Sequence, residues 1–459
     1  MDQELETWKE KIPKNWEVKK LGELCNTTSG GTPSRGNKNY YNGNIPWVKS
    51  GELEKGIIYD TEEKISEDGI KTSSAKIFPK GTLLIALYGA TIGKLAFLGV
   101  DAATNQAICG IFKSDQLDSN YLYYYLFFCK PKLINQGIGG AQPNISQAII
   151  RSTPIPLPPI AEQQTIVAKI EELFSELEKG KEQLETALAQ LKVYQQSLLQ
   201  AAFTGKLTNP GVMEGELPEG WKWVKLGEVC EKIQDGSHFS PQNQAKDKFP
   251  GSFLYITAKN IQNGYMDLRN LVYIDKEFFD SIYSRCNPES GDVLLTKDGV
   301  NAGEVTINTL NEPFALLSSV CLIKPSKSIL LSKYLMYYIQ SPIGNRYLIG
   351  DMTGTAIKRI ILKKIKLSLL VLTKITEQEQ IVQILESKLT VCDKIEETIK
   401  KSLAQAEVLR QSILKQAFEG KLVLHIQTEI ESVATEKNDP LIKKKQKLRS
   451  KTFKWSHLF

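Results

Sequence analysis

The stretch from Ala161 to Leu207 reads AEQQTIVAKIEELFSELEKGKEQLETALAQLKVYQQSLLQAAFTGKL and determines the architecture of the chain. It contains no proline, and its apolar side chains recur every three or four residues, which is typical of a long helix with one apolar face. At about 1.5 Å per residue this helix is a rod of roughly 60 Å, too long for the core of a compact domain, so we expect a spacer. The apolar stripe comprises Ile166, Ile170, Phe174, Leu177, Leu184, Leu188, Leu191, Tyr194 and Leu198.

A second copy of this stretch begins 215 positions later, at Thr376, and ends at Leu422. The two copies align without a gap, and about nineteen of roughly 47 positions are identical, which indicates an internal repeat. The second stripe recurs on average every 3.5 residues or so, as a coiled-coil seam requires, so we expect the two helices to pack on each other. This stripe comprises Ile381, Leu385, Leu389, Cys392, Ile395, Ile399, Leu403, Ala406, Leu409 and Ile413.

The repeat also includes the region that precedes each helix. The segment from Pro13 to Cys25, PKNWEVKKLGELC, matches the segment from Pro218 to Cys230, PEGWKWVKLGEVC. Short apolar runs broken by Gly, Asn and Pro predict mostly β structure with a few helices in both halves. We therefore predict an α+β fold with two β-rich domains in a pseudo-two-fold repeat and two long antiparallel helices. The predicted bounds are 1–158 for the first domain, 159–207 for the first helix, 208–373 for the second domain, 374–424 for the second helix and 425–459 for a basic tail.

Composition and charge limit the class of protein. A chain of 459 residues predicts about two to four domains. The chain has no run of eighteen apolar residues and begins with a polar, charged segment, so we expect neither a membrane span nor a secretory signal, and a cytoplasmic location. Seven cysteines without a CxxC pair and three histidines argue against disulfides and structural zinc. The net charge of +6 permits a polyanionic partner, although the basic tail is equally typical of a solvated, disordered end.

The two halves differ most where loops are expected. Residues 27–35 read TTSGGTPSR, and the corresponding residues 233–240 read IQDGSHFS. Similar frames that carry different loops indicate similar roles on different targets.

The order of motifs resembles one family across nearly the whole chain. These motifs are PLPPIAEQQTIVAKI, QAAFTGKL, the restart PEGW, EQEQIVQIL and QAFEGKL. Together they resemble the DNA specificity (S) subunit of type I restriction-modification systems, which act in phage defence. The resemblance implies that each globular half is a target-recognition domain that reads one part of a split DNA sequence, and that the helices hold the halves apart.

The resemblance also implies the partners. These are double-stranded DNA, two methyltransferase (M) subunits docked on the helices, and restriction/translocase (R) subunits. We expect no cofactor in this chain, because S-adenosylmethionine, ATP and magnesium belong to the partner subunits of that family.

Sequence motifs for catalysis are weak. Residues 89–95, GATIGKL, are one residue short of a phosphate-binding loop and end in Leu, which cannot bind magnesium, so a hairpin is the better interpretation. Residues 157–160, LPPI, lack the polar and aromatic residues of a base-methylation site, and residues 52–55, ELEK, are only a faint nuclease pattern. His238 has no visible catalytic partner. The sequence therefore predicts a chain without an active site of its own.

Side chains suited to reading DNA occur in the predicted loops. Arg and Lys recognise guanine, and Asn and Gln recognise adenine, when a rigid frame presents them in the major groove. Each is also compatible with turn chemistry or a solvated charge, and some are expected to contact only phosphate. The candidates are Thr32, Ser34, Arg35, Lys38, Lys49, Tyr88, Asn105 and Gln106 in the first half, and Ser237, His238, Lys259, Asn260, Lys297, Asn301, Lys358 and Arg359 in the second.

Two other functions remain open at this point. One is the specificity subunit of a bipartite type II system, in which methyltransferase and nuclease are fused; only the partner's sequence separates it from type I. The other is a non-catalytic structural tether, which predicts duplex binding that ignores sequence and needs no partner.

Overall fold

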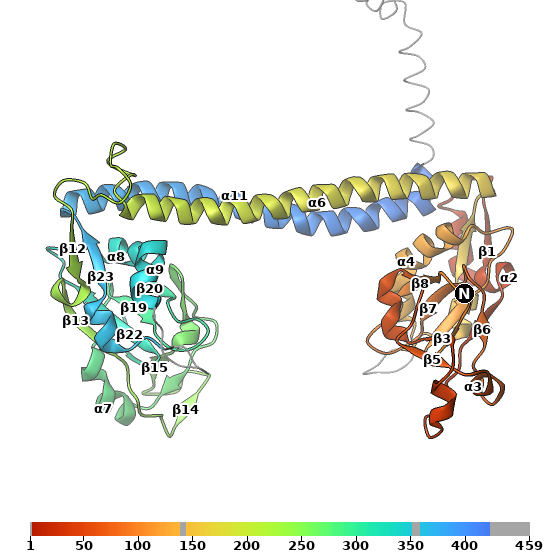
Figure 1. Ribbon diagram of the computed structural model, residues 1–459, viewed down its shortest axis with the longest axis horizontal. Coiled ribbons are helices and arrows are strands. Elements are labelled where there is room, and N and C mark those ends of the chain that lie inside the picture. The colour runs from red at the N-terminus through yellow and green to blue at the C-terminus, as the bar shows by residue number, and fades with distance from the viewer. Residues whose placement is uncertain (1, 138–143, 351–358, 423–459) are drawn as a thin grey trace, which may run out of the picture. The chain divides into compact units, whose positions relative to one another are not determined.

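The structure is a computed structural model that describes residues 2–137, 144–350 and 359–422. It divides into two units, of which unit 1 consists of residues 1–182 and 402–459 and unit 2 of residues 183–401. The two long helices, α6 (Ile160–Phe203) and α11 (Ile375–Phe418), contribute to both units (Figure 1). The predicted basic tail, 425–459, lies outside the described residues. The domain bounds given from the sequence remain predictions.

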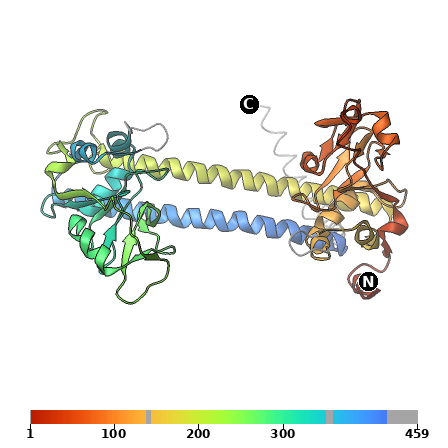
Figure 2. The ribbon, with the colours of Figure 1, turned by 90° about the horizontal axis from the view of Figure 1, so that it is seen from below.

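The two helices pair antiparallel within each unit. In unit 1 the first turns of α6, with Ile166 and Ile170, share a core with the last turns of α11, with Ile413 and Leu414. In unit 2 the last turns of α6 share a core with the first turns of α11. Figures 1 and 2 both show α6 and α11 side by side in each unit. The predicted fold class, α+β with two β-rich halves and two long antiparallel helices, is confirmed.

Three positions of the predicted seam are exposed rather than buried. Tyr194 is 47% exposed, Ile395 44% and Leu409 49%. A seam between only two helices leaves its flanking side chains partly in solvent. In the last turns of α6 the buried stripe moves to Leu198, Leu199, Ala202 and Phe203, which pack on unit 2. Because successive residues of a helix are about 100° apart around its axis, Tyr194 lies roughly 110° from the middle of that stripe. Leu409 lies at the same angle from the corresponding buried stripe in the last turns of α11.

Unit 1 contains two main sheets and a two-stranded ribbon. The central strand β7 is buried on both faces because its alternate side chains enter two different cores, Leu83 and Ile85 one and Leu84 and Ala86 the other. The larger sheet has the order β2 (Thr27–Ser29), β10 (Ile108–Ile111), β7 (Leu83–Ala86), β8 (Leu95–Leu98), β4 (Ile57–Ile58). The other has the order β5 (Glu63–Ile65), β3 (Ile45–Val48), β9 (Ala102–Thr104), β6 (Ile77–Phe78), and the ribbon pairs β1 (Glu17–Lys20) with β11 (Pro154–Leu157).

Unit 2 repeats this plan. Its central strand β19 sends Val293 and Leu295 into one core and Leu294 into another. The first sheet has the order β13 (Cys230–Asp235), β22 (Val320–Pro325), β19 (Val293–Thr296), β20 (Val305–Ile307). The second has the order β14 (Gln244–Ala245), β18 (Tyr273–Ile274), β15 (Phe253–Ile256), β21 (Phe314–Leu316). Two ribbons pair β12 (Lys222–Lys225) with β23 (Leu369–Leu372) and β16 (Ile261–Gln262) with β17 (Tyr265–Met266).

Shorter helices cover these sheets. Unit 1 has α1 (Asp2–Lys9), α2 (Leu21–Leu24), α3 (Glu67–Lys71), α4 (Ser119–Asn135) and α5 (Gln147–Ser152), with 3-10 turns η1 (Lys38–Tyr41) and η2 (Ser50–Lys55). Unit 2 has α7 (Lys276–Cys286), α8 (Ser332–Gln340), α9 (Pro342–Ile349) and α10 (Leu362–Leu367), with 3-10 turns η3 (Leu226–Glu228) and η4 (Ala258–Asn260). None of the helices formed by the described residues is both long and apolar enough to cross a membrane.

A buried glutamine near the start of each long helix joins that helix to the unit in which the helix begins. The side chain of Gln163 is fully buried; its amide nitrogen donates to the carbonyls of Gln116 and Pro158, at 3.0 and 2.8 Å, and its oxygen accepts from the backbone N–H of Asp118 at 2.8 Å. Gln378 repeats this arrangement in unit 2, with hydrogen bonds to the carbonyls of Ile329 and Thr373. Each amide is fully satisfied, so the start of each helix has one defined orientation.

The opposite ends of the helices dock through aromatic rings. Phe203, in the last turn of α6, packs edge-on against Tyr334 and Tyr338 in unit 2, with ring centroids 5.1 and 5.3 Å apart. Phe418, in the last turn of α11, contacts Tyr121 and Tyr125 in unit 1 in the same way, at 5.3 and 4.9 Å. The two units therefore bury the repeat-related phenylalanines in matching aromatic pockets.

A glycine lies two residues after each of these phenylalanines. Gly205 and Gly420 have positive φ angles of 79° and 74°, which favour glycine. A Cβ atom on Gly205 would lie 2.2 Å from Pro218, and one on Gly420 would lie 2.4 Å from Pro13. The end of each long helix thus contacts a proline at which one of the two repeats begins.

Candidate nucleic-acid interface

Several strands of unit 1 end together at one border of its sheets, which we call edge 1. It consists of the ends of β2, β3, β7 and β9 and the start of β10. Backbone hydrogen bonds join these ends: Gly31 N–H donates to Thr104 at 2.9 Å, Asn105 N–H to Val48 at 3.0 Å, and Leu87 N–H to the carbonyl of Ala107 at 2.7 Å. Loops that are far apart in the sequence therefore share one frame.

The glycine at the end of β2 is required by this frame. A Cβ atom on Gly30 would lie 2.3 Å from the carbonyl oxygen of Thr104, closer than nonbonded atoms approach. Its counterpart Gly236, at the end of β13, would meet the carbonyl oxygen of Leu316 at 2.1 Å. Close backbone approach at both positions explains why glycine occurs in both halves although the loops that follow it differ.

Edge 1 brings together most of the predicted residues of the first half. The hydroxyl of Thr32 donates to the side-chain carbonyl of Gln106, which is exposed. Arg35 and Lys49 meet on Glu63, with ion pairs of 2.6 and 3.2 Å. The Arg35 guanidinium also lies over the rings of Tyr41 and Trp47, 4.3 and 5.0 Å from their centroids. Arg35 is thus held in place although 54% of its side chain is exposed.

Charge at edge 1 is largely compensated. The hydrogen bond from Arg35, assisted by Lys49 and opposed by burial, lowers the pKa of Glu63. Lys49 also pairs with Glu62 at 2.8 Å. Both cations therefore already have partners, which limits how freely they can neutralise a phosphate.

The other four predicted residues of the first half vary in their roles. Ser34 and Lys38 are exposed. Tyr88 is partly buried against the core. The side-chain oxygen of Asn105 accepts from the backbone N–H of Ala107 at 3.2 Å, so this residue stabilises the turn into β10, which is the alternative considered from the sequence.

Unit 2 has the same border, which we call edge 2. It consists of the ends of β13, β15, β19 and β21, the start of β22 and residues 359–360. Ser237 N–H donates to Leu316 at 2.7 Å, Leu317 N–H to Ile256 at 3.0 Å, and Lys297 N–H to the carbonyl of Ser319 at 2.9 Å. These bonds repeat the pattern of edge 1 one for one, so Lys297 takes the place of Leu87.

Three predicted residues of edge 2 are buried, which differs from the expectation of direct DNA contact. Ser237 is 3% exposed, Asn260 2% and Lys297 3%. The hydroxyl of Ser237 accepts from the backbone N–H of Phe239 at 3.0 Å. The amide of Asn260 donates to the carbonyls of Asp267 and Asn270 at 3.0 and 3.1 Å. Their polar atoms are used within the protein, so these side chains hold the loops rather than face solvent.

Lys297 belongs to a buried charge network. Its ammonium lies 3.5 Å from Asp235 and 3.4 Å from Asp298. Asp235 also accepts a 2.7 Å hydrogen bond from Arg285 and lies 3.2 Å from His238. Burial raises the pKa of the Asp235 carboxyl, but the hydrogen bond from Arg285 and the charges of Lys297 and His238 outweigh it, so the net shift is downward.

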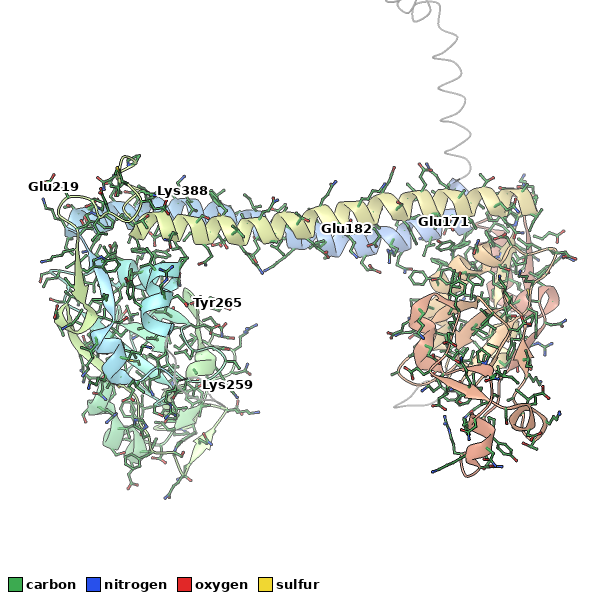
Figure 3. All side chains as sticks on the ribbon, in the orientation of Figure 1. Glu171, Glu182, Glu219, Lys259, Tyr265 and Lys388 are labelled. Carbon is green, nitrogen blue, oxygen red and sulfur yellow. The ribbon has the colours of Figure 1, made fainter. Side chains whose placement is uncertain are left out.

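The remaining predicted residues of edge 2 are more accessible. Arg359 pairs with Asp298 at 2.9 Å and is 57% exposed, and the side chain of His238 is 56% exposed. Lys259 is exposed on η4, directly after β15 (Figure 3). Asn301 lies on the hairpin between β19 and β20 and is partly exposed. Lys358 lies outside the described residues.

The family model for the "Type I restriction modification DNA specificity domain" matches residues 13–186 and 218–405, which together make up most of the chain. The chain belongs to this family. The two matched segments begin at Pro13 and Pro218, the prolines that begin the two repeats.

Two relatives of the specificity-domain family match along most of their length. The type I restriction enzyme MjaIX specificity subunit of Methanocaldococcus jannaschii is 27% identical over 365 residues, which cover 76% of this chain and 80% of the relative. The EcoKI specificity subunit of Escherichia coli is 23% identical over 428 residues and covers 90% of both chains.

Two solved structures share the fold. A chain from a study of the complex assembly and conformational transition of the type I R-M system has a TM-score of 0.68 at 21% identity, over 89% of this chain and 99% of that chain. The HsdS subunit of Thermoanaerobacter tengcongensis has a TM-score of 0.56 at 21% identity, over 89% of this chain and 98% of that chain.

In this member of the specificity-domain family, the weak catalytic motifs have structural roles. Residues 89–93 form the hairpin between β7 and β8, closed by Gly93 N–H to the carbonyl of Ala86 at 2.8 Å, which confirms the hairpin interpretation. The Glu52 carboxylate accepts from the backbone N–H groups of Lys49 and Glu62 at 3.0 and 3.1 Å, so it caps η2. Among residues 2–137, 144–350 and 359–422, no three His, Cys, Asp or Glu side chains gather in a group that could hold a metal ion.

Two important residues of edge 2 were not among the predicted ones. Arg285, the second-last residue of α7, donates to the carbonyls of Asp235 and Gly236 at 3.0 Å as well as to the Asp235 carboxylate. Fifty residues separate Arg285 from Asp235. Neither lies in a recognisable motif, so no signal in the sequence pairs them.

Proposed function

We propose that this chain is the DNA specificity subunit of a type I restriction-modification complex and that edges 1 and 2 each read one part of a split target. One observation carries the proposal: the same hydrogen-bonded frame occurs twice and presents different polar side chains each time. Rigid frames with variable loops are the usual way in which recognition is changed without changing a fold.

The accessible side chains at both edges suit base and phosphate contacts. At edge 1, Arg35 offers a paired donor for guanine, and Gln106 offers a donor and an acceptor for adenine. At edge 2, Arg359, His238 and Lys259 are the accessible donors. Counting Arg285, Lys297 and Arg359 against Asp235 and Asp298, the network has one cation more than it has anions, which favours a polyanion. We propose that the buried residues Ser237, Asn260 and Lys297 act by positioning these loops.

We propose that the chain carries out no reaction and binds no cofactor. The partners in this proposal are duplex DNA, two methyltransferase subunits that use S-adenosylmethionine, and restriction/translocase subunits that use ATP and magnesium. The family membership supports this division of work. The repeat supports the number of methyltransferases, because two similar units offer two similar docking surfaces. The cytoplasmic location stays a prediction.

We further propose that α6 and α11 set the length of the unread segment between the two half-sites. Removing one heptad from both helices shortens each by about 10 Å, the rise of roughly three base pairs. The expected result is a shorter gap between unchanged half-sites. A change in the bases read, with the gap unchanged, would contradict the spacer role.

Co-expression with its methyltransferase subunit, followed by mapping of methylated adenines across a genome, tests the proposal. The expected result is one split motif with a fixed gap. Replacing residues 1–158 by the first half of a different specificity subunit should change only one part of that motif. Duplex binding that ignores sequence and needs no partner would instead support a structural tether. A partner that carries its own nuclease domain would indicate the bipartite type II system.

A further inference from the structure

One aromatic side chain at edge 2 is left in solvent. Phe239 lies four residues after the end of β13 and is 75% exposed. No other phenylalanine within residues 2–137, 144–350 and 359–422 is exposed to this extent. A single exposed apolar residue is ordinary on a protein surface, so the surroundings of the ring must show whether it has a role.

The backbone that carries this ring is held by the frame of edge 2. The N–H of Phe239 donates to the hydroxyl of Ser237 at 3.0 Å, and that hydroxyl donates to the carbonyl of Phe239 at 3.3 Å. Ser237 itself is 3% exposed; its N–H donates to the carbonyl of Leu316 at 2.7 Å, and its carbonyl accepts from the N–H of Ser318 at 2.9 Å. The attachment point of the ring is therefore fixed while the ring stays accessible, which lowers the entropy cost of a contact.

Unit 1 shows that the frame does not need this ring. Gly30 and Gly236 correspond, so the position of Phe239 is taken by Pro33. Pro33 is buried, and its carbonyl accepts a 2.6 Å hydrogen bond from the hydroxyl of Tyr41. The first loop of edge 1 thus folds back on its own unit at this position. Since the same frame forms with a buried proline, the exposed ring of unit 2 has no structural use in it.

The neighbours of Phe239 are charged. His238, the preceding residue, is 56% exposed and lies 3.2 Å from the carboxylate of Asp235. Arg285 and Lys297 share that carboxylate, at 2.7 and 3.5 Å. A polyanion is the partner that the surplus of cations attracts, and an apolar ring among these charges adds a contact that a phosphate cannot use. A ring at this place therefore suits the edge of a base.

Only one of the four bases carries an apolar group in the major groove. Thymine presents a 5-methyl group beside its O4 acceptor, and phenylalanine is among the side chains that contact it. We propose that Phe239 packs against the 5-methyl group of a thymine in the half-site read by unit 2 and thereby selects that base. This inference rests on the proposed function, because it names one base that edge 2 distinguishes and the side chain that distinguishes it. Edge 1 has no counterpart of this contact, since Pro33 is buried.

The test uses the full chain in complex with its methyltransferase and a duplex that carries the mapped motif. The exchange of residues 1–158 described above assigns one part of the motif to unit 2. Each thymine in that part is replaced in turn by uracil, which lacks only the methyl group, and fluorescence anisotropy measures binding. At one position the unaltered chain is expected to bind about fourfold more weakly without the methyl group, the effect of exposing one small apolar group.

The variant Phe239→Ala completes a cycle with this change in the DNA. It is expected to bind the thymine duplex about tenfold more weakly than the unaltered chain does, and to lose the response to uracil at that position. Phe239→Leu keeps an apolar side chain and should retain part of the response. Circular dichroism and thermal melting of both variants should match the unaltered chain, since most of the ring lies in solvent.

The variant Tyr265→Ala is the matched control. Tyr265 is an aromatic residue of the same unit, is 56% exposed and lies on β17, outside edge 2 (Figure 3). Its removal should change neither the affinity nor the response to uracil. Uracil in the half-site read by unit 1 is a second control, because any effect there should be equal in the unaltered chain and in Phe239→Ala.

Three outcomes overturn the inference. If Phe239→Ala responds to uracil as the unaltered chain does, another side chain reads the methyl group. If Phe239→Ala binds more weakly but no thymine read by unit 2 responds to uracil, the ring makes a different contact, such as insertion between base pairs. If Phe239→Ala binds as tightly as the unaltered chain, the ring does not contact DNA. A split motif in the methylation map leaves the proposed function intact in all three cases, whereas its absence would contradict the proposed function itself.

Discussion

Units 1 and 2 agree in the parts that hold their long helices and differ at edges 1 and 2. The buried glutamines, the docked phenylalanines and the glycine–proline contacts occur in both units, with partners at equivalent positions. At the edges the same backbone frame carries Leu87 in unit 1 and Lys297 in unit 2, each almost fully buried. The comparison shows that the frame tolerates either an apolar or a charged interior, provided that the charge is paired.

The two units also cover the same strand pair in different ways. In unit 1, α1 packs on β1 and β11, and Trp8 contacts the ring of Tyr125 with centroids 6.1 Å apart. In unit 2, α9 packs on β23, and Tyr347 contacts Trp223 of β12. Covering the apolar strands β11 and β23 is a physical requirement, but which segment of the chain covers them is not, so this part of the repeat was free to diverge.

The largest effect is expected from substituting the docked phenylalanines, which tests whether the two units are stabilised separately. Phe203→Ala and Phe418→Ala each remove a fully buried ring, which costs about 3–5 kcal/mol. We expect Phe203→Ala to lower amide protection in unit 2 and Phe418→Ala to lower it in unit 1, as measured by hydrogen exchange. If a variant does not fold, Phe→Leu at the same positions should give the same pattern more weakly. Equal loss in both units from either variant would contradict independent stabilisation.

Two substitutions at edge 2 would give it the residues found at the matching positions of edge 1. Asp235→Ser installs the residue found at the matching position, Ser29, and leaves Lys297 buried with less compensation. Breaking a buried pair in this way costs about 3 kcal/mol. Adding Lys297→Leu, as in edge 1, removes the uncompensated charge, so the double variant should recover most of the stability. Denaturant unfolding measures this, and additive losses would show that the two charges are not coupled.

The pH dependence of the edges should also differ. The pKa of Asp235 is lowered below 3.8 in the folded protein, so its contribution to stability is present at neutral pH and is lost as the pH falls through the folded value. The pKa of Glu63 at edge 1 is also lowered, but 30% of its side chain is exposed, so solvent screens its ion pairs. We expect residues 235–240 to lose amide protection in acid more steeply than residues 30–35. Asp235→Asn should remove this difference.

The smallest expected effect on stability comes from the exposed arginines. Arg35 and Arg359 form ion pairs with more than half of each side chain in solvent, and such pairs contribute less than about 1 kcal/mol. Arg35→Ala and Arg359→Ala should therefore melt almost like the unaltered chain. If these residues read bases, each variant should relax the methylated motif in only one of its two parts. A uniform loss of methylation at all sites would indicate phosphate contact instead.

The pattern of residues was sufficient to predict the long helices, because a stripe over more than forty residues reports a local periodicity that no other structure satisfies. The repeat and the difference between the loops of the two halves were also predictable. For Ser237, Asn260 and Lys297 it was not possible to predict burial. The polarity of a side chain does not reveal whether its partners lie in solvent or in another strand.

The sequence by itself determined that this chain repeats a β-rich domain followed by a long helix, and that the loops of the two copies differ. Repeats and periodicities can be read from the sequence because they are patterns of residues along the chain. Only the tertiary structure decided which of those loop residues face outward, that Arg285 meets Asp235, and that Tyr194, Ile395 and Leu409 are left exposed. These outcomes depend on contacts between residues far apart in the chain, whose energies no local pattern records.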